Sequence, residues 1–518
     1  MDQISDADGL TFEIHDLILS HSVTAMRRDP GPESNVGSWL VAHADARPDH
    51  PALLVEGTGE RVSYGELEAR VNRAAAALAG LGVRAGDRVA LALASEPLYL
   101  ELYFATALLG AILIPLNTRL TAAELGFQIE DSEPRVVVRA PGSDVPARAG
   151  TRMLEPDELR ARMPARAERP VPAPGGESPQ VILYTSGTTG RPKGAVLPHR
   201  KTYWNTRNAE LYFELIPTDV VVVPIPLFHS FGLKILSVPT LFVGATAVLV
   251  DRFDPIGLQN CVARERASLL GAVPVMYERM LGAGLAREKF ATLRFAFSAG
   301  SALGVDTIER YWQAGIRLKQ GYGQTETSIL CCLDAADARR LAGSVGKPVA
   351  FGEVRIADEQ GHDLPRGARG EIVVRGPIVM TGYWRRPEET LLSRIDGWHR
   401  TGDLGVMDEE GNVSLVGRLK ELYISGGENV YPAEVERVLG QHPDVSEVAV
   451  VGVPDERWGE AGRAYVVPAH ADFDSARVLA WASSRLARYK LPREVVVVAE
   501  LPRTASGKVQ KHALLARI

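Results

Sequence analysis

One short segment of the chain combines the residue types that bind a polyphosphate. Residues 184–196 contain three glycines, which leave room for backbone N–H groups to turn toward an anion. Lys193 adds a mobile positive charge. Four hydroxyl side chains supply further donors: Thr185, Ser186, Thr188 and Thr189. Apolar residues 181–183 and 195–197 flank this segment and predict two strands joined by a loop, which we call the phosphate loop (residues 185–193).

Two other interpretations of the phosphate loop compete with this one. A surface turn rich in serine, threonine and glycine has a similar composition and no ligand. A Walker P-loop needs a glycine five positions after Gly187, where Pro192 stands, and it should open a helix. Composition alone leaves the surface turn open, so the choice depends on the rest of the chain.

Further motifs follow the loop in a defined order. They are residues 227–232 (LFHSFG), 298–302 (SAGSA), 320–326 (QGYGQTE), 399–403 (HRTGD), 417–418 (GR), 425–432 (SGGENVYP) and 502–508 (PRTASGK). In this order and spacing the set resembles the adenylate-forming superfamily of acyl-CoA synthetases, nonribosomal-peptide adenylation domains and luciferases. The resemblance covers roughly residues 36–518.

The resemblance implies a reaction in two steps. A carboxylate is first joined to the α-phosphate of ATP, with Mg²⁺ bound and pyrophosphate released. The acyl group then passes to a nucleophile, usually the thiol of CoA or of a carrier protein. The family has a large N-terminal domain and a small mobile C-terminal domain, with the active site between them.

The same resemblance assigns nucleotide-binding roles. The β- and γ-phosphates would be held by Thr185, Ser186, Gly187, Thr188, Thr189 and Lys193. Adenine would lie along Tyr322, although a tyrosine in a turn is the alternative interpretation of that residue taken alone. The neighbours expected to line the nucleotide are Gly321, Gly323, Gly300 and Ser301. Asp403 would accept hydrogen bonds from both ribose hydroxyls, because a carboxylate is an acceptor-only group, and Arg418 would support it.

The residues expected to act in the chemistry come from three motifs. Thr325 resembles the family's α-phosphate hydroxyl, and Glu326 resembles its Mg²⁺ carboxylate, a hard oxygen ligand. A lone glutamate is usually a solvated surface residue, so this role depends on the 320–326 motif. Lys508 resembles the catalytic lysine, whose cation stabilises the negative charge that gathers in the transition state. His229 is counted with this group as an aromatic gate linked to the thioester step, without an acid–base role.

Two further features of the resemblance concern the change between the two steps. Lys420 matches the hinge position, where rotation would present either Lys508 or the thiol tunnel at Gly426 and Gly427. Many family members have aspartate after the hinge lysine, whereas this chain has Glu421, which keeps the charge.

The motif at residues 227–232 bears on the substrate. Amino-acid-activating members usually carry Phe-Asp-x-Ser there, with the aspartate binding the α-amino group, whereas this chain has His229 after Phe228. A buried ammonium without a partner is costly, which argues against an amino-acid substrate. The apolar residues 227–236 favour a fatty or aromatic acid, in a pocket formed by Phe228, His229, Phe231 and Gly300.

Three functions remain in view. The first is an acid–thiol ligase that makes a CoA thioester. The second keeps the adenylation step but passes the acyl group to a carrier-protein thiol or a nitrogen nucleophile. The third, a nucleotide-binding protein without catalysis, is disfavoured because Thr325, Glu326, Asp403 and Lys508 are all present. Nothing in the sequence indicates light emission.

Periodic patterns predict the elements that position these residues. Apolar residues at helical spacing predict a helix over residues 66–81, followed by a strand at 87–93, a helix at 98–110 and a strand at 111–115. This alternation predicts an α/β fold with doubly wound sheets, then a β-rich subdomain near residues 351–416. A compact α+β pattern closes the chain. We expect an N-terminal arm (1–35), a large domain (36–419) and a small mobile C-terminal domain (420–518).

Composition places the chain in a broad class. The 518 residues have a net charge of −6, which argues against nucleic acid as the main partner. The three cysteines, Cys261, Cys331 and Cys332, have neither metal-site nor disulfide spacing, which fits a reducing cytoplasm. An acidic N-terminus does not resemble a signal peptide, and apolar runs at 102–116 and 235–250 are short for a membrane span. The sequence leaves a monomer and a dimer equally open.

Overall fold

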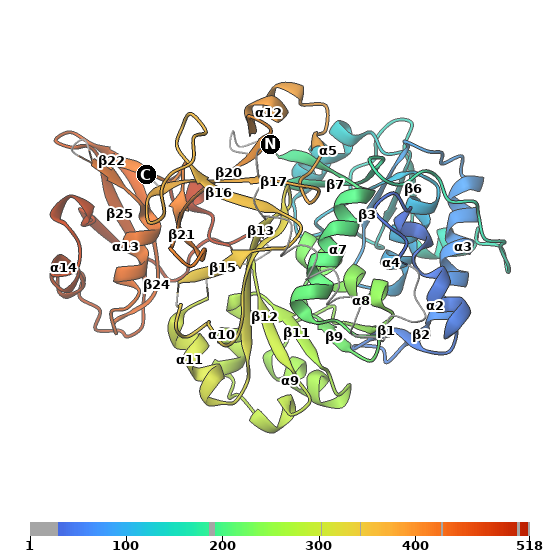
Figure 1. The fold of residues 1–518 in the computed structure, drawn as a ribbon, viewed down its shortest axis with the longest axis horizontal. Coiled ribbons are helices and arrows are strands. Elements are labelled where there is room, and N and C mark those ends of the chain that lie inside the picture. Colours follow the sequence, from blue (N-terminus) through green and yellow to red (C-terminus); the bar gives the residue numbers. More distant parts are fainter. Residues whose placement is uncertain are drawn as a thin grey trace, which may run out of the picture.

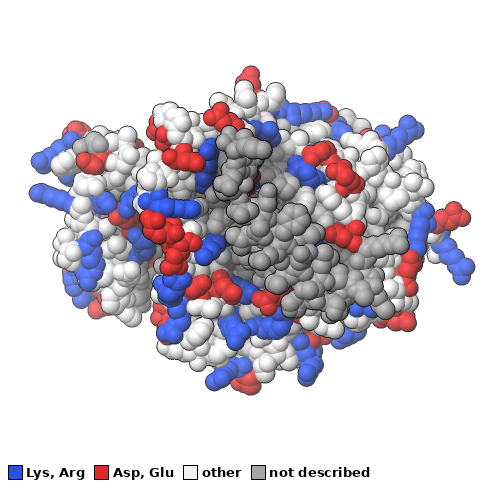
Figure 2. Space-filling view, in the orientation of Figure 1, with Lys and Arg blue, Asp and Glu red and all other residues white. Residues whose placement is uncertain are grey.

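The computed structural model describes residues 29–185, 192–301, 303–341, 343–425, 428–504 and 508–515. Three β-sheets organise these residues. In Figure 1 the seven-stranded sheet lies at the upper right, the large sheet extends from the centre to the lower right, and the C-terminal sheet lies at the left. On the described part of the face in Figure 2, acidic and basic side chains are mixed. No helix in the described ranges is long and apolar enough to cross a membrane.

The seven-stranded sheet carries the phosphate loop. In spatial order its strands are β18 (Gly382–Tyr383), β8 (Lys193–Pro198), β7 (Pro179–Thr185), β4 (Ile112–Pro115), β3 (Arg88–Ala92), β5 (Val136–Arg139) and β6 (Arg152–Leu154). Strands β3 to β7 pair in parallel with their neighbours, whereas β7 and β8 form an antiparallel hairpin in which Tyr184 faces Gly194 and Thr185 faces Lys193. The predicted hairpin on either side of the loop is therefore confirmed.

Local sequence explains the helices of this region. Helix α3 (Tyr64–Gly80) begins at Ser63, whose side chain accepts a hydrogen bond from the backbone of Glu66. Helix α4 (Pro97–Leu108) is buried along its whole length, because it is apolar on every face and packs between layers. Helix α5 (Ala122–Ser132) begins with a capping box between Thr121 and Glu124. The helices and strands predicted over residues 66–115 are confirmed within a few residues.

The largest sheet combines a parallel and an antiparallel half. The parallel half contains β1 (Pro51–Val55), β10 (Thr246–Leu249), β9 (Val220–Val223), β11 (Leu269–Ala272), β12 (Phe295–Ser298) and β13 (Leu318–Gln324), with β2 (Arg61–Ser63) at its edge. The antiparallel half contains β14 (Ser328–Leu333), β15 (Ser344–Pro348), β21 (Val413–Arg418), β20 (Trp398–Met407), β17 (Arg369–Arg375), β16 (Glu353–Ala357) and β19 (Arg394–Ile395). The predicted β-rich region is thus continuous with the parallel sheet.

Helices cover these sheets. They include α2 (Val41–Ala46), α6 (Pro156–Arg160), α7 (His199–Phe213), α8 (Val238–Val243), α9 (Pro255–Arg264), α10 (Pro274–Gly282), α11 (Val305–Gln313) and α12 (Pro387–Leu392). A π-helical turn, Phe231–Ser237, precedes α8. The apolar run at 235–250 is therefore core helix and strand, as predicted. At the end of the predicted arm, Asn35 is buried and its side chain donates to the carbonyl oxygens of Ala107 and Ala173, so this residue is packed against the large domain.

The C-terminal part has its own sheet and core. Its strands are β22 (Tyr423–Ser425), β23 (Glu428–Val430), β24 (Val445–Asp455), β25 (Gly459–Pro468) and β26 (Glu494–Val497). Helices α13 (Pro432–Leu439), α14 (Ser475–Ser483) and α15 (Lys511–Leu515) accompany it. Buried side chains of the sheet and helices, among them Val435, Leu439, Val450, Val466 and Val478, form one cluster. The boundary at residue 420 remains a prediction, and the first strand of this sheet begins at Tyr423.

Candidate active site

Glu326 joins the phosphate loop to the largest sheet. It lies in the turn between β13 and β14, and only 9% of it is exposed. Thr185, the last residue of β7, donates a hydrogen bond from Oγ1 to Glu326 Oε1 at 3.0 Å. Tyr383 donates from its hydroxyl to the same oxygen at 3.2 Å. The backbone N–H of Met380 donates to the Glu326 carbonyl at 2.8 Å. The predicted Mg²⁺ carboxylate and the start of the predicted phosphate site are therefore in contact.

The other described end of the loop lies close to the same group. The Lys193 ammonium is 5.3 Å from the centre of the Tyr383 ring, a distance at which a cation is attracted to an aromatic face. Ser186, Gly187, Thr188 and Thr189 lie outside the described residues, so their predicted phosphate contacts stay predictions. Thr185 and Lys193 are paired across the hairpin, which places a hydroxyl and a cation on the two sides of the loop entrance.

Close packing explains the glycines on either side of Tyr322. A Cβ atom at Gly321 would lie 2.5 Å from the Phe297 ring, and one at Gly323 would lie 1.9 Å from the carbonyl oxygen of Ser328. Both distances are too short for any side chain, so strand β13 accepts only glycine at these positions. Tyr322 therefore lies within a strand that packs tightly on its neighbours, which removes the alternative of a tyrosine in a surface turn.

Asp403 is a buried carboxylate with donors from two other strands. Tyr322 donates from its hydroxyl to Asp403 Oδ2 at 2.7 Å, and Gln324 donates from Nε2 to the same oxygen at 2.6 Å. Arg418 Nε lies 2.9 Å from Asp403 Oδ1. A carboxylate accepts about four hydrogen bonds, so binding both ribose hydroxyls would require exchange of one donor. Arg418, whose side chain is 46% exposed, is the donor most easily displaced.

Burial sets the protonation state of Tyr322. Desolvation raises the pKa of its phenol well above the usual range, and the neighbouring Asp403 carboxylate raises it further. Tyr322 therefore stays protonated and donates to Asp403 at any physiological pH. Its hydroxyl thus orients the Asp403 carboxylate.

Lys508 comes from the C-terminal part of the chain and lies beside these carboxylates. Desolvation lowers the pKa of its ammonium below the usual lysine range and Arg418 lowers it further, whereas Asp403 and Glu326 raise it. Protein surrounds the ammonium on most sides, yet the residue as a whole keeps contact with solvent. Its backbone N–H donates to Thr504 Oγ1 at 3.1 Å, so Lys508 is hydrogen-bonded to a residue four positions earlier in the chain. The structure therefore brings the predicted catalytic lysine to the predicted nucleotide site.

His229 is a neutral imidazole near the same place. Burial, together with the cations of Arg119 and Lys508, lowers its pKa to about 4. Its buried Nε2 atom has no hydrogen-bond partner among the described residues. The Phe228 and His229 rings are 4.7 Å apart. A neutral ring in an apolar setting fits the predicted gate, and it agrees with the absence of an assigned acid–base role.

The remaining predicted residues fall in four groups. Gly300 has φ of +95°, a conformation for which glycine is suited, and it follows β12 with Ser301. Lys420 is an exposed residue. Partial desolvation of its ammonium, together with the cations of Arg418 and Lys193, lowers the pKa of that group. Thr325 precedes Glu326 in the β13–β14 turn. Gly426 and Gly427, the predicted thiol tunnel, lie outside the described residues.

Two residues of this site were not predicted from the sequence. Gln324 donates to Asp403 and lies inside the 320–326 motif, so its position in that motif was an available signal. Tyr383 donates to Glu326 across 57 residues, and no local pattern marks that contact. Each orients a carboxylate whose own role was predicted.

This fold and this group of residues define an AMP-binding enzyme, and the chain belongs to that family. The family model for the AMP-binding enzyme matches residues 40–384, and the model for its C-terminal domain matches residues 434–508. The predicted family, its two-domain α/β fold and its class, an AMP-forming acid–CoA ligase that uses ATP, Mg²⁺ and CoA, are confirmed.

Individual relatives have names that are more specific. The chain is 41% identical over 483 residues to a feruloyl-CoA synthase from Amycolatopsis sp., covering 92% of this chain and 97% of the relative. It is 39% identical over 503 residues to an indoleacetate–CoA ligase from Aromatoleum aromaticum, covering 92% and 96%. The solved structure of ATP-bound MatB from Rhodopseudomonas palustris is similar with a TM-score of 0.88 and 37% identity, covering 94% of this chain and 99% of MatB.

Proposed function

We propose that the protein activates an aromatic carboxylic acid as its acyl-AMP, with release of pyrophosphate, and transfers the acyl group to the thiol of CoA. The observation that carries this proposal is the convergence of Thr185, Glu326 and Lys508, which come from three distant parts of the chain. Relatives named feruloyl-CoA synthase and indoleacetate–CoA ligase support an aromatic acid. A fatty acid is the alternative substrate class.

The residues present fit a magnesium-bound triphosphate. Glu326 offers carboxylate oxygens, which are the ligands that Mg²⁺ prefers. Thr185 and Lys193 stand at the entrance of the phosphate loop and supply a hydroxyl donor and a cation. Bound Mg²⁺ would neutralise phosphate charge and so favour the departure of pyrophosphate. Glu326 would hold the ion, and its own orientation is set by the Thr185 and Tyr383 hydroxyls.

The chemical step rests on charge stabilisation. A carboxylate that attacks phosphorus carries negative charge toward a group that is already anionic, so the barrier is lowered by a positive charge held close to both. Lys508 supplies that charge, since Asp403 and Glu326 beside it favour its protonated form. Asp403, held by Tyr322 and Gln324, would fix the ribose and thereby the α-phosphate relative to Lys508.

Aromatic side chains stand beside the nucleotide motif. The Phe231 and Phe297 rings meet edge to face with their centres 5.8 Å apart. The Phe297 ring also packs directly on Gly321, as the 2.5 Å distance to a Cβ at that position shows. Ring edges carry partial positive charge and ring faces partial negative charge, so such a wall binds a flat aromatic ring favourably. The rings of Phe228 and His229 form another pair, with their centres 4.7 Å apart.

The proposal also names the acyl acceptor, the location of the protein and its oligomeric state. We favour CoA over a carrier-protein thiol or a nitrogen nucleophile, because the relatives reported above are a CoA synthase and a CoA ligase. A cytoplasmic location, where ATP and CoA are available, and either a monomer or a dimer are compatible with this function.

The test measures pyrophosphate release with and without CoA over a panel of acids. The panel contains hydroxycinnamic, arylacetic and benzoic acids, medium- and long-chain fatty acids, and amino acids, and thioester is measured by chromatography. We expect release with at least one aromatic acid, stimulation by CoA, and formation of the aryl or arylacyl thioester.

Each other result contradicts one part of the proposal. Activity confined to fatty acids would replace the aromatic substrate class. Pyrophosphate release without any CoA thioester would favour the carrier-protein or nitrogen acceptor. ATP binding without turnover on any acid would overturn catalysis itself.

A further inference from the structure

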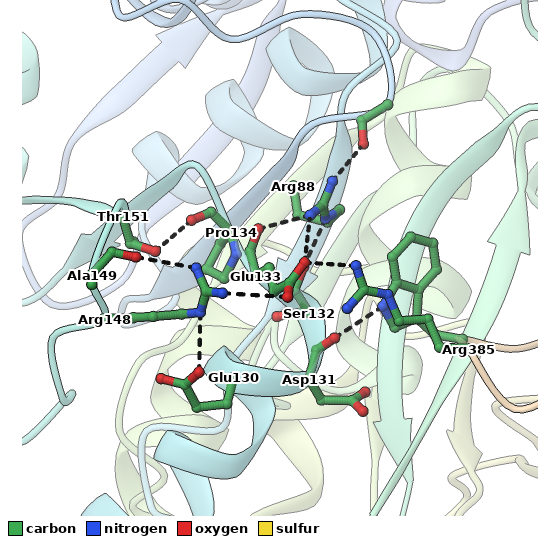
Figure 3. A network of polar contacts seen from close by, with 12 residues as sticks. Arg88, Glu130, Asp131, Ser132, Glu133, Pro134, Arg148, Ala149, Thr151 and Arg385 are labelled. Atoms are coloured by element: carbon green, nitrogen blue, oxygen red, sulfur yellow. Dashed lines mark hydrogen bonds and ion pairs between the residues drawn. The ribbon is translucent and has the colours of Figure 1, made fainter.

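Asp131 connects three segments that lie around the phosphate loop. It is the penultimate residue of α5, and its side chain is 10% exposed. The Tyr184 hydroxyl donates to Asp131 Oδ2 at 2.7 Å, and Arg386 Nη2 donates to Oδ1 at 2.7 Å. The indole N–H of Trp384 donates to the Asp131 backbone carbonyl at 3.1 Å. Figure 3 shows Asp131 at the edge of the polar network formed around α5.

These partners hold both strands of the hairpin that carries the loop. Tyr184 is adjacent to Thr185 on β7 and faces Gly194 on β8. The backbone N–H of Trp384 donates to the Gly194 carbonyl at 2.7 Å. Tyr184 on β7 is therefore hydrogen-bonded directly to Asp131, and Gly194 on β8 is connected to Asp131 through Trp384.

The same connections reach the predicted Mg²⁺ carboxylate. Tyr383 precedes Trp384, donates to Glu326 and lies under the Lys193 ammonium. A shift of residues 383–386 would therefore move the Glu326 donor together with the partner of Lys193. Catalytic groups act only when they are held close to the productive geometry, and that requires a second set of contacts around them.

We propose that Asp131 is a positioning residue for the phosphate loop, and that it sets the distance between the loop entrance and Glu326 by holding Tyr184, Trp384 and Arg386. Asp131 touches neither nucleotide nor acid in this role and acts through the hairpin. The inference rests on the proposed function, since it concerns ATP binding at that site. It predicts that loss of the Asp131 carboxylate weakens the binding of MgATP and leaves the acid site unaffected.

The environment of Tyr184 supports this role. Burial raises the pKa of its phenol, and the hydrogen bond to Asp131 raises it further. The hydroxyl therefore remains a donor throughout the physiological pH range. A buried hydrogen bond to a charged acceptor is among the stronger ones in proteins, which suits a contact that fixes the base of a loop.

Glu133 provides a matched control in the same network. It lies two residues further along the chain and pairs with Arg385 at 2.6 Å, Arg148 at 3.3 Å and Arg88 at 3.8 Å. Figure 3 shows these three arginines converging on Glu133. Among its contacts in the described residues, none is to the β7–β8 hairpin. A Glu133→Gln variant therefore weakens the contact to Arg385 in segment 383–386 but keeps the bonds of Tyr184, Trp384 and Arg386 to Asp131.

The experiment compares Asp131→Asn, Tyr184→Phe, the double variant and Glu133→Gln in the full-length protein. MgATP affinity is measured by calorimetry in the absence of acid, and KM for ATP, KM for acid, kcat and Tm are measured alongside. We expect Asp131→Asn to weaken MgATP binding about tenfold and Tyr184→Phe about threefold. The double variant should be close to Asp131→Asn alone, because the two residues act through one contact. Glu133→Gln should stay within about twofold of the parent protein.

The results separate the inference from the function on which it rests. If the parent protein does not bind MgATP, both are overturned. If the parent protein binds MgATP and Asp131→Asn and Tyr184→Phe bind it equally well, only the role of Asp131 is overturned. Equal weakening by Glu133→Gln and Asp131→Asn would also overturn it, since the effect would then belong to the charge cluster. Should Asp131→Asn fail to fold, Tyr184→Phe, which removes one hydroxyl, decides the outcome.

Discussion

At the scale of single residues, the site consists of two buried carboxylates whose donors come from different elements. Glu326 is held by Thr185 and Tyr383, and Asp403 by Tyr322, Gln324 and Arg418. Each donor fixes an orientation that a free carboxylate would not keep. Desolvation and Arg418 lower the pKa of the Lys508 ammonium, and the charges of Asp403 and Glu326 oppose that lowering. We propose that this cation is the group on which the chemical step depends most, because it would stabilise charge that develops in the transition state.

We predict that Lys508→Ala lowers the rate of acyl-AMP formation by at least about a hundredfold. The alanine variant should bind MgATP within about twofold of the parent protein, because Lys508 acts on charge that develops in the transition state. Pyrophosphate release in single turnover and calorimetric ATP binding measure the two quantities. Lys347→Ala, at an exposed lysine on β15, is the control. Adenylation by Lys508→Ala at the parent rate would show that the catalytic assignment is wrong.

At the scale of elements, helix α7 brings a buried lysine to the strand that follows Glu326. Lys201 donates from Nζ to Ser328 Oγ, and Ser328 has φ of +64° at the start of β14. The pKa of Lys201 is lowered to about 7, mainly by burial; the Glu326 carboxylate opposes the lowering and the Arg200 cation adds to it. The helix thus holds the turn that carries Glu326 by a polar contact inside the core. A buried cation makes that contact costly, and the cost depends on pH.

We predict a pH-dependent stability difference between the parent protein and Lys201→Met. Unfolded lysine titrates near pH 10.4, so between pH 7 and pH 10 the unfolded chain binds a proton that folded Lys201 has lost. Stability from this group therefore rises with pH, by at most about 1.4 kcal/mol per pH unit. The free energy of unfolding of the parent protein, minus that of Lys201→Met, should increase from pH 7.5 to pH 9.5 in urea titrations.

The control for this measurement is Lys347→Met at an exposed position. The free energy of unfolding of Lys347→Met should follow that of the parent protein in parallel over the same pH range, since the substituted side chain lies on the surface. Parallel curves for Lys201→Met as well would contradict the lowered pKa of Lys201.

At the scale of the whole molecule, the site is assembled from two parts of the chain with separate sheets. Lys508 belongs to the C-terminal part, whereas Asp403 and Glu326 belong to the largest sheet. Arg369 on β17 also lies 3.5 Å from Glu434 on α13, which is a second contact between the parts. We propose that this arrangement, with Lys508 turned toward the nucleotide site, corresponds to the first step. The proposal implies that the C-terminal part turns for thioester formation, with Lys420 as the predicted hinge.

We predict that Lys420→Pro slows thioester formation by more than about tenfold while acyl-AMP formation changes by less than about threefold. Proline fixes φ near −65° and so restricts rotation at this position. Lys420→Ala, which removes the charge but keeps the rotation, is the matched control and should affect both steps mildly. Single-turnover pyrophosphate and thioester assays measure the steps separately. Equal slowing of both steps by Lys420→Pro would contradict the hinge assignment.

Sequence patterns predicted much of this protein because they describe local interactions. The apolar repeat at residues 66–81 corresponds to α3. The apolar stretches at residues 181–183 and 195–197 correspond to β7 and β8. Gly321 and Gly323 were predicted to line the nucleotide, and the structure adds that a Cβ atom at these positions would meet Phe297 and Ser328. The motifs also identified the family, since their order and spacing reflect a common chain path.

Only the tertiary structure decided which groups meet. Thr185 and Glu326 are 141 residues apart, and Tyr322 and Asp403 are 81 apart. Such pairs depend on the register of strands that pair across the whole sheet, and no local pattern encodes that register. The same holds for Asp131, an ordinary acidic residue near a helix end until the fold places Tyr184, Trp384 and Arg386 around it. Residue types thus determined the chemistry available to this chain, and long-range packing determined which side chains carry it out.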